Sequence, residues 1–480
     1  MKKILFVASE AIPYIKTGGL ADVTGSLPKY FASNQYDVRV IIPKYACMNE
    51  QDKKKLHHEL HFYVDLGWRK QYVGILSAKS DGITYYFVDN EYYFAGDQPY
   101  HNIYEDVEKF AFFSKAVLEA LPRLSYMPDI LHCHDWQTAL VPVYLEQCYK
   151  ADAFYQNMKT ILTIHNLQFQ GRFHLQTVRD ITGLPDALFR PDKLEAYGEA
   201  NYLKGGIIYA DAVTTVSPTY AKDILTTEGG EGLNGVLQNH EYKLHGILNG
   251  IDNHVYDPVT DPDIPCNYGE NDLVAGKEVN KKALLQKMGL PYDPEFLVVG
   301  MVSRITEQKG YALIDYMMEE LLSDGRIQLI VLGTGEERYQ NMLKHFEWRY
   351  PDMLKANITY SEELAHSIYA GADALLMPSQ FEPCGLSQLM SMRYGTVPIV
   401  RETGGLKDTV IPYNACDETG TGFTFRDYNA HKMRDAIYDA HQVYSDHKES
   451  WYGIMRRGME QDFSWEKSAR AYENLYDRLS

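Results

Sequence analysis

Short hydrophobic runs recur along the whole chain, and helical patterns of hydrophobic and polar residues separate them. The runs have the length of buried strands, and their alternation with helices is typical of a mostly parallel sheet covered by helices on both faces. Strands are predicted at residues 4–9, 38–43, 84–88, 129–134, 159–164, 212–217, 245–248, 296–302, 327–332, 374–377 and 397–400. The pattern therefore predicts an α/β protein.

The alternation pauses in the middle of the chain, where residues 256–265 are polar and rich in proline, a composition typical of a linker. A chain of 480 residues is also too long for one ordinary domain. We therefore predict two Rossmann-like domains, residues 1–249 and 250–460, whose parallel sheets face each other across a cleft. Residues 451–479 form one helical pattern. Its end, residues 461–480, is expected to pack back on the first domain.

Composition narrows the classes of partner. The 47 basic and 65 acidic residues give a net charge of −18, which argues against nucleic acid or an anionic membrane surface. We expect no membrane span, because no run approaches 18 apolar residues. The six cysteines form no C-x-x-C pair, so we expect neither a zinc site nor a disulfide scaffold, and a cytoplasmic protein with reduced thiols.

The first candidate site is Lys16-Thr17-Gly18-Gly19, between the first predicted strand and a helix whose apolar positions include Leu20 and Val23. Two glycines allow the backbone to approach a ligand closely, and a helix N-terminus attracts anions through its N–H groups. Lys16 adds a positive charge. The stretch predicts a pocket for a phosphorylated ligand, although a plain tight turn with a solvated lysine explains it equally well.

Three further loops follow predicted strands in the second half of the chain. Residues 303–310 contain Arg304 and Lys309, which suit phosphate as a bidentate and a point-charge ligand respectively. Residues 381–386 and 402–406 each open a helix, the latter through a second Gly-Gly pair. Ligands of parallel sheets bind at the carboxyl ends of the strands, so these loops are expected to converge. Taken alone, two cations in a loop are more often solvated.

Seven motifs occur in an order that points to one family. They are Lys16–Val23 (KTGGLADV), His132–Gln137 (HCHDWQ), His165-Asn166, Ser303-Arg304, Gln308–Gly310, Phe381–Leu386 (FEPCGL) and Thr403–Gly405. The chain resembles the bacterial glycogen synthases and plant starch synthases of glycosyltransferase family 5, over nearly its whole length. The resemblance implies the GT-B fold, with an acceptor-side first domain and a nucleotide-sugar second domain. It also implies transfer of glucose from ADP-glucose to the non-reducing 4-OH of glycogen or another α-1,4-glucan, with retention.

The resemblance implies roles for individual residues. The implied catalytic set is Lys16, His165, Arg304, Lys309 and Glu382. The implied substrate-binding set is Gly18, Gly19, Asp22, Asn249, Tyr360, Cys384, Gly385, Leu386, Thr403, Gly404, Gly405, Asp135, Trp136 and Asn166. Arg304 and Lys309 would bind the diphosphate, and Lys16 would contact the donor near its phosphates and glucose. Thr403 and the second Gly-Gly pair would seat phosphate or ribose. Glu382 and His165 would hold glucose hydroxyls, and Tyr360 would stack on the nucleobase. Asp135, Trp136 and Asn166 would contact the acceptor.

No metal and no cofactor is expected. Asp261-Pro262-Asp263 has the D-x-D spacing with which metal-dependent sugar transferases hold a cation, but it does not follow a strand, so we interpret it as linker. Many retaining transferases of this fold carry a second glutamate eight residues after the first. Met390 stands at that position here, with Gln388 nearby.

A single well-placed carboxylate, Glu382, favours a front-side displacement, in which the leaving phosphate accepts the acceptor's proton, over a covalent glycosyl-enzyme. Two other functions stay open: a related enzyme that uses UDP-glucose or a small acceptor such as fructose, and a non-catalytic glucan-binding protein. His134 and His165 have a structural alternative as hydrogen-bonded core residues, and Cys384 is interpreted as a packing residue.

Overall fold

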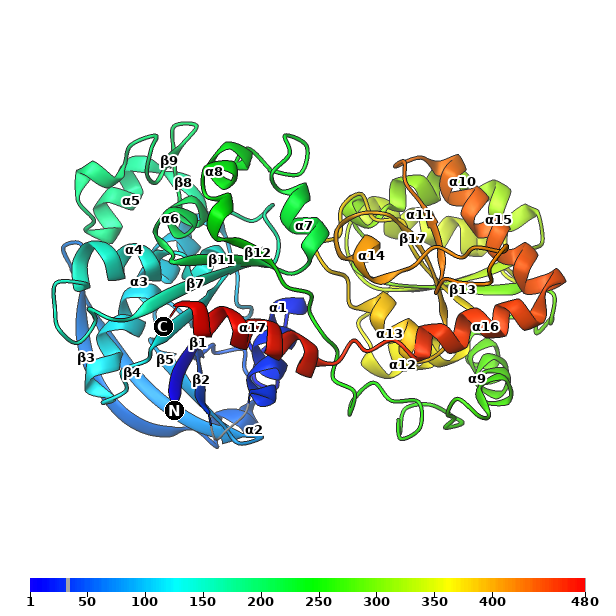
Figure 1. Cartoon of the computed structure of the whole chain (residues 1–480), viewed down its shortest axis with the longest axis horizontal. Helices are drawn as coiled ribbons and strands as arrows, with labels where there is room; N and C mark the ends of the chain where they lie inside the picture. Colours follow the sequence, from blue (N-terminus) through cyan, green and yellow to red (C-terminus); the bar gives the residue numbers. More distant parts are fainter. Residues whose placement is uncertain (32–34, 480) are drawn as a thin grey trace. The chain divides into compact units, whose positions relative to one another are not determined.

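The computed structural model describes residues 1–31 and 35–479, which form two compact units (Figure 1). Unit 1 contains Met1–Asn249 together with the C-terminal residues Trp465–Ser480, and unit 2 contains Gly250–Ser464. Each unit is built on its own α/β sheet with parallel strands, so the predicted fold class is confirmed.

The sheet of unit 1 has nine strands in the order β12-β11-β7-β6-β1-β2-β5-β4-β3. The strands are β1 (Lys2–Val7), β2 (Tyr36–Pro43), β3 (His57–Leu66), β4 (Arg69–Ser80), β5 (Ile83–Asp89), β6 (Ile130–His134), β7 (Lys159–Ile164), β11 (Ala212–Thr215) and β12 (Leu244–Gly246). A separate small sheet contains β8 (Arg172–His174), β9 (Glu195–Ala196) and β10 (Glu199–Asn201). The strands from β12 to β5 are parallel, and the central ones are nearly continuous buried runs, as expected for a sheet covered on both faces.

The prediction of a mostly parallel sheet missed one edge of unit 1. β4 pairs antiparallel with both β3 and β5, and β3 alternates exposed and buried side chains toward its end. An edge hairpin with one face in water has no continuous hydrophobic run, so the pattern of such runs does not predict it.

The helices of unit 1 lie mostly in the connections between strands. They are α1 (Gly19–Ser26), α2 (Glu50–Lys53), α3 (Ile103–Arg123), α4 (Leu140–Tyr144), α5 (Leu175–Thr182), α6 (Tyr202–Tyr209), α7 (Pro218–Asp223), α8 (Asn234–Asn239) and α17 (Trp465–Leu479). Short single-turn segments are η1 (Leu27–Tyr30), η2 (Trp136–Thr138), η3 (Leu145–Tyr149), η4 (Asp186–Leu188) and η5 (Glu241–Lys243).

Unit 2 has a fully parallel sheet in the order β15-β14-β13-β16-β17-β18. Its strands are β13 (Leu297–Val302), β14 (Ile327–Leu332), β15 (Leu354–Asn357), β16 (Ala374–Met377), β17 (Val397–Arg401) and β18 (Phe423–Phe425). Its helices are α9 (Leu273–Met288), η6 (Glu307–Lys309), α10 (Tyr311–Ser323), α11 (Glu337–Arg349), α12 (Glu362–Gly371), α13 (Ser387–Arg393), α14 (Gly404–Thr409), α15 (Ala430–Asp446) and α16 (Lys448–Met459).

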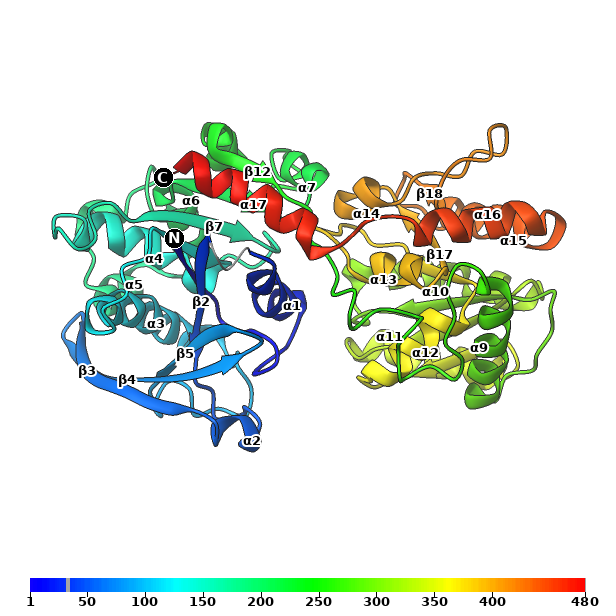
Figure 2. The ribbon, with the colours of Figure 1, turned by 60° about the horizontal axis from the view of Figure 1, so that its bottom comes forward.

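The C-terminal helical pattern is two helices rather than one. α16 ends at Met459 in unit 2, and α17 begins at Trp465 and belongs to unit 1. Figures 1 and 2 show α17, in red, beside the first strands of unit 1, where Lys2 pairs with Asp477 at 2.9 Å. The continuous pattern hid the break, because residues on either side are amphipathic.

Candidate functional site

The glycine loop of unit 1 leaves open space at a helix start. α1 begins at Gly19, and Gly18 precedes it in an extended conformation with φ −161°. A Cβ added to Gly18 would meet no atom within 4 Å, so neither φ nor packing within the chain requires glycine there. The missing side chain therefore keeps the space in front of the helix start clear.

Two carboxylates hold this loop. Lys16 Nζ lies 3.0 Å from an Asp22 oxygen in the first turn of α1. Glu10 is 3% exposed and accepts hydrogen bonds from the Thr17 backbone N–H, the Thr17 hydroxyl and Tyr100. Burial raises the pKa of Glu10, while its hydrogen bonds oppose that rise. Glu10 is not among the residues predicted from the sequence, although a charged residue just past a buried strand is a signal of a functional position.

Adjacent parallel strands bring the two histidine motifs together. β6 ends at His134 and β7 ends at Ile164, and His134 Nδ1 lies 3.0 Å from Nε2 of His165. Asp135 follows β6 with φ +57° and ψ −174°, a conformation that residues other than glycine rarely adopt. Its carboxylate accepts a hydrogen bond from the His165 backbone N–H at 2.7 Å. Such strain is typical of functional sites.

Burial shifts the ionisation of this group of residues toward the neutral forms. It raises the pKa of Asp135 to about 7, against the effect of backbone N–H groups from His165 and Asn166. Burial also lowers the pKa of His165 to about 3. The imidazole is therefore neutral at physiological pH.

The other predicted residues of unit 1 are Trp136 and Asn166, beside the same strand ends, and Asn249, the last residue of the first segment of unit 1. Trp136 packs edge-on against Phe110 and Phe173, with ring centroids 5.2 Å and 5.6 Å away, and is partly exposed. The Asn166 side chain accepts a hydrogen bond from the Gln168 backbone. Asn249 is buried, and its Oδ1 has no hydrogen-bond partner among the described residues.

In unit 2, two strand-end loops bring a predicted phosphate ligand to a predicted sugar ligand. Lys309 Nζ lies 2.5 Å from Glu382 Oε2, although 73 residues separate them in the chain. The side chains of this pair are only 16% and 7% exposed. Ser379 donates a second hydrogen bond to the same Glu382 oxygen at 3.1 Å. Arg304 is exposed, and its guanidinium reaches Gln308 at 3.5 Å.

Close packing within the chain requires both glycines of the second Gly-Gly pair, although it does not require Gly18 in the first pair. A Cβ on Gly404, which has φ +44°, would lie 1.9 Å from the Glu382 carbonyl oxygen, and one on Gly405 would lie 2.1 Å from that of Cys384. The Gly405 N–H also donates to the carbonyls of Glu382 and Pro383. The pair, which follows buried Thr403, therefore lets the Glu382 loop lie directly on the start of α14.

Gln388 holds the loop after Glu382 through side-chain hydrogen bonds. The buried Gln388 amide donates to the carbonyls of Cys384 and Gly385. Leu386 precedes α13 and is partly buried. Tyr360, which is 69% exposed, hydrogen-bonds Glu362.

Two family models and several curated relatives match the chain. Residues 3–239 match the starch synthase catalytic domain, and residues 285–449 match the glycosyl transferases group 1 family. The chain is 57% identical to a glycogen synthase of Lachnospira eligens over 479 residues, covering 100% of both chains. It is 48% identical to that of Bacillus licheniformis, covering 99% of this chain and 98% of the relative. The chain belongs to the glycogen and starch synthase family.

A solved member of the glycogen and starch synthase family has the same fold. The catalytic domain of Arabidopsis thaliana starch synthase IV, bound to ADP and acarbose, superposes with a TM-score of 0.90. It is 34% identical and covers 100% of this chain and 99% of that domain. A sucrose-phosphate synthase from Thermosynechococcus elongatus shares the fold at a TM-score of 0.62 and 18% identity, with 100% of this chain and 99% of that one covered.

The D-x-D segment is packed into unit 2. Asp261 is 2% exposed, and its carboxylate accepts hydrogen bonds from Tyr394, from the Asp263 backbone and, at 2.7 Å, from His366. Potential ligand atoms of Asp261, Asp263 and His366 lie within 4.8 Å of one another. Both oxygens of Asp261 are already engaged in hydrogen bonds, so these contacts fix the segment onto α12 rather than leaving it an exposed linker.

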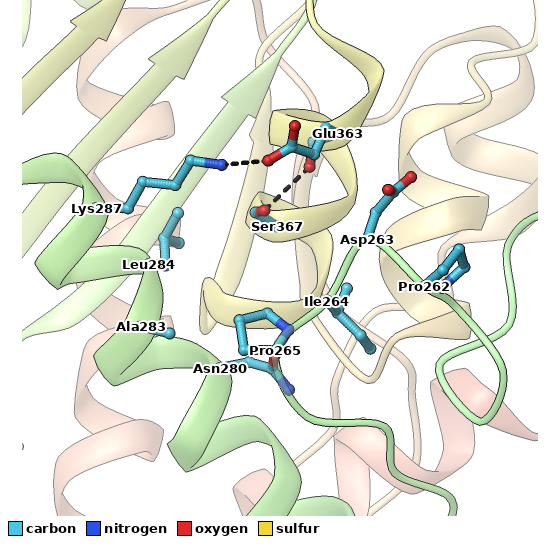
Figure 3. A pocket seen from close by; sticks show the side chains of 10 residues that line it. All are labelled: Pro262, Asp263, Ile264, Pro265, Asn280, Ala283, Leu284, Lys287, Glu363 and Ser367. Atoms are coloured by element: carbon cyan, nitrogen blue, oxygen red, sulfur yellow. Dashed lines mark hydrogen bonds and ion pairs between the residues drawn. The ribbon is translucent and has the colours of Figure 1, made fainter.

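A cavity of about 280 Å³ lies beside this segment, lined by α9, α12 and residues 262–265 (Figure 3). Lys287 and Glu363 form an ion pair at its wall. None of the predicted site residues lines it.

Among the described residues, no helix has both the length and the apolar character needed to cross a bilayer.

Proposed function

We propose that the chain is a retaining glucosyltransferase that moves glucose from ADP-glucose to the non-reducing 4-OH of an α-1,4-glucan. Its family membership supports the reaction class. The observation that carries the proposal is the Lys309–Glu382 contact, because it joins a cation suited to a diphosphate with a carboxylate suited to sugar hydroxyls. A protein that only bound glucan would need no such cation.

The residues of unit 2 bind the sugar-nucleotide donor in this proposal. Lys309 and Arg304 bind the diphosphate, Glu382 holds glucose hydroxyls, and Tyr360 stacks on the adenine. Cys384, Gly385 and Leu386 shape the sugar side of this loop, and Thr403, Gly404 and Gly405 position it beneath the donor. Both cations stabilise the charge that grows on the leaving diphosphate, so they act more on the transition state than on the bound substrate.

The residues of unit 1 supply the other contacts. Lys16 binds the donor near its phosphates and is held by Asp22. Gly18 leaves space for the ligand, and Gly19 begins α1 beside it. His165 contacts the glucose near its 6-OH. Asp135, Trp136 and Asn166 contact the acceptor, and Asn249 offers its buried amide oxygen to the donor side.

The chemistry we propose is a front-side displacement. Glu382 is held by Lys309 and Ser379, so its carboxylate is engaged as a hydrogen-bonded ligand rather than as a nucleophile. The leaving phosphate then accepts the proton of the acceptor hydroxyl. The charge on the leaving group is met by Lys16, Arg304 and Lys309, so we assign no metal and no cofactor. The cytoplasm is the proposed compartment, since the widely spaced cysteines suit a reducing environment.

The test is release of nucleoside diphosphate from ADP-glucose and UDP-glucose, with and without glycogen. We expect release from ADP-glucose that depends on glycogen, together with growth of the glucan chain. Release that prefers UDP-glucose, or that needs fructose in place of glycogen, would identify the related enzyme instead. Glycogen binding without any release from either donor would identify a binding protein.

A further inference from the structure

A buried histidine pair connects the predicted sugar ligand His165 to the sheet. His134 is 0% exposed, and its Nδ1 lies 3.0 Å from Nε2 of His165. The two ring centroids are 5.3 Å apart, and the Phe6 ring also stacks on His134. The pair lies inside unit 1, at the ends of β6 and β7.

Both imidazoles are neutral. Burial lowers the pKa of His134 well below its ordinary value and that of His165 to about 3. A neutral imidazole carries its hydrogen on one nitrogen only, so one ring of the pair donates and the other accepts.

The surroundings of His134 decide the direction of this hydrogen bond. Its second nitrogen, Nε2, is buried and has no hydrogen-bond partner among the described residues. If His165 donated, His134 would carry its hydrogen on Nε2, and a buried N–H would point at no acceptor. Orphaned buried donors are the rarest unsatisfied groups in proteins. If His134 donates from Nδ1, only a lone pair is left unpaired.

The hydrogen bond from His134 fixes the tautomer of His165. Because Nε2 of His165 accepts this hydrogen bond, the neutral His165 ring carries its own hydrogen on Nδ1. No described residue hydrogen-bonds Nδ1 of His165, and the residue is partly exposed, so Nδ1 is the ring nitrogen available to a ligand. We infer that His134 is a positioning residue that fixes His165 as the Nδ1–H tautomer, so that His165 presents a donor to a sugar hydroxyl oxygen. The identity of that sugar rests on the proposed function.

His132, two residues earlier on β6, is a matched comparison. Its ring stacks on His134 at 4.4 Å, but both of its nitrogens have partners. Nδ1 lies 2.8 Å from the Tyr476 hydroxyl of α17, and Nε2 lies 2.7 Å from the Thr163 hydroxyl. His132 therefore has no nitrogen directed at His165, and loss of the Tyr476 hydroxyl should leave the tautomer of His165 unchanged.

The test is nitrogen-15 NMR of the full chain labelled at histidine, which distinguishes protonated from bare ring nitrogens. Signals are assigned from the variants His134→Phe and His165→Gln. We expect Nδ1–H for both His134 and His165 in the wild-type chain. His134→Phe keeps a flat ring but loses the donor, and should give His165 a mixture of tautomers. His134→Asn keeps a donor near the Nδ1 position and should restore the Nδ1–H form.

Kinetics give the second readout. We expect His134→Phe to lower kcat about tenfold, the effect of one lost hydrogen bond, with the KM for glucan within about twofold. His134→Asn should recover most of that loss, and Tyr476→Phe should leave both kcat and the tautomer unchanged.

An Nε2–H signature for His165 in the wild-type chain would overturn the inference. So would an Nδ1–H signature that persists in His134→Phe. The tautomers are measured without substrate, so failure of the glucosyltransferase proposal would appear separately, as no diphosphate release by the wild-type chain.

Discussion

Replacing Lys309 with alanine is expected to reduce both the stability of unit 2 and turnover. The change removes the ammonium that lies 2.5 Å from Glu382 and leaves a carboxylate whose side chain is 7% exposed. Only the Ser379 hydroxyl, at 3.1 Å, then remains as a hydrogen-bond donor to that oxygen in the described structure.

The size of the stability effect follows from this geometry. Removing one partner of a buried ion pair costs about 3–5 kcal/mol. We expect the lower end, about 3 kcal/mol, because Lys309 is 16% exposed and water can reach the vacated position. Glu382→Gln needs no counter-ion, so adding it to Lys309→Ala should recover about 2 kcal/mol, a coupling typical of residues in direct contact.

Turnover should fall by orders of magnitude in Lys309→Ala, because the lost charge acts on the leaving diphosphate in the transition state. Glycogen binding should persist, since the acceptor contacts are assigned to other residues. Lys287→Ala is the matched control, because it breaks another lysine–glutamate pair of unit 2 whose side chains are 46% and 65% exposed. It should change stability by less than about 1 kcal/mol and leave turnover intact.

Stability is best measured by native-state hydrogen exchange at the amides of β13 and β16, because a chain of two units need not unfold in one step. The single and double variants of Lys309 and Glu382 complete the cycle, with diphosphate release measured on each. Additive stability effects, within about 0.5 kcal/mol, would refute the claim that the pair stabilises unit 2. Unchanged turnover in Lys309→Ala would refute its role in the reaction.

Three further predictions test unit 1 and the glycines. Burial raises the pKa of Asp135 to about 7, so the folded chain holds this proton more tightly than the unfolded chain and loses stability as pH rises from about 4 to 7. At pH 8 the free energy of unfolding of Asp135→Asn should therefore exceed that of wild type by about 1–2 kcal/mol, a value reduced because Asp135 is partly exposed. The variant should nevertheless be inactive. Urea unfolding that shows no gain in stability at pH 8 would contradict this. Gly18→Ala should change the free energy of unfolding by no more than about 0.5 kcal/mol while raising the KM for the donor. Gly404→Ala should lower the free energy of unfolding by about 3 kcal/mol or more. Equal effects of the two variants in thermal unfolding would disprove this contrast. Tyr476→Phe leaves a buried nitrogen of His132 without its partner and should cost about 1–2 kcal/mol in urea unfolding, an effect whose absence would show that this contact does not help to hold α17.

The hydrophobic pattern alone determined most of the strands. Residues 159–164, 327–332 and 374–377 were predicted with the bounds that β7, β14 and β16 have, because central parallel strands are buried on both faces and form continuous apolar runs. The pattern failed where one face meets water, as in the β3–β4 hairpin, and where two amphipathic helices follow each other, as at α16 and α17. Such segments carry a weaker signal because half of their residues are polar.

The hydrophobic pattern also indicates the candidate site residues, because functional loops follow the ends of strands and those ends can be predicted from the sequence. What only the tertiary structure decided is which side chains meet. The Lys309–Glu382 contact spans 73 residues, the His134–His165 hydrogen bond spans 31, and α17 joins a unit that begins more than 450 residues earlier. Helical and strand periodicity reports only on near neighbours in the chain. Contacts between distant residues depend on strand order and on the packing of whole elements, which no local pattern encodes.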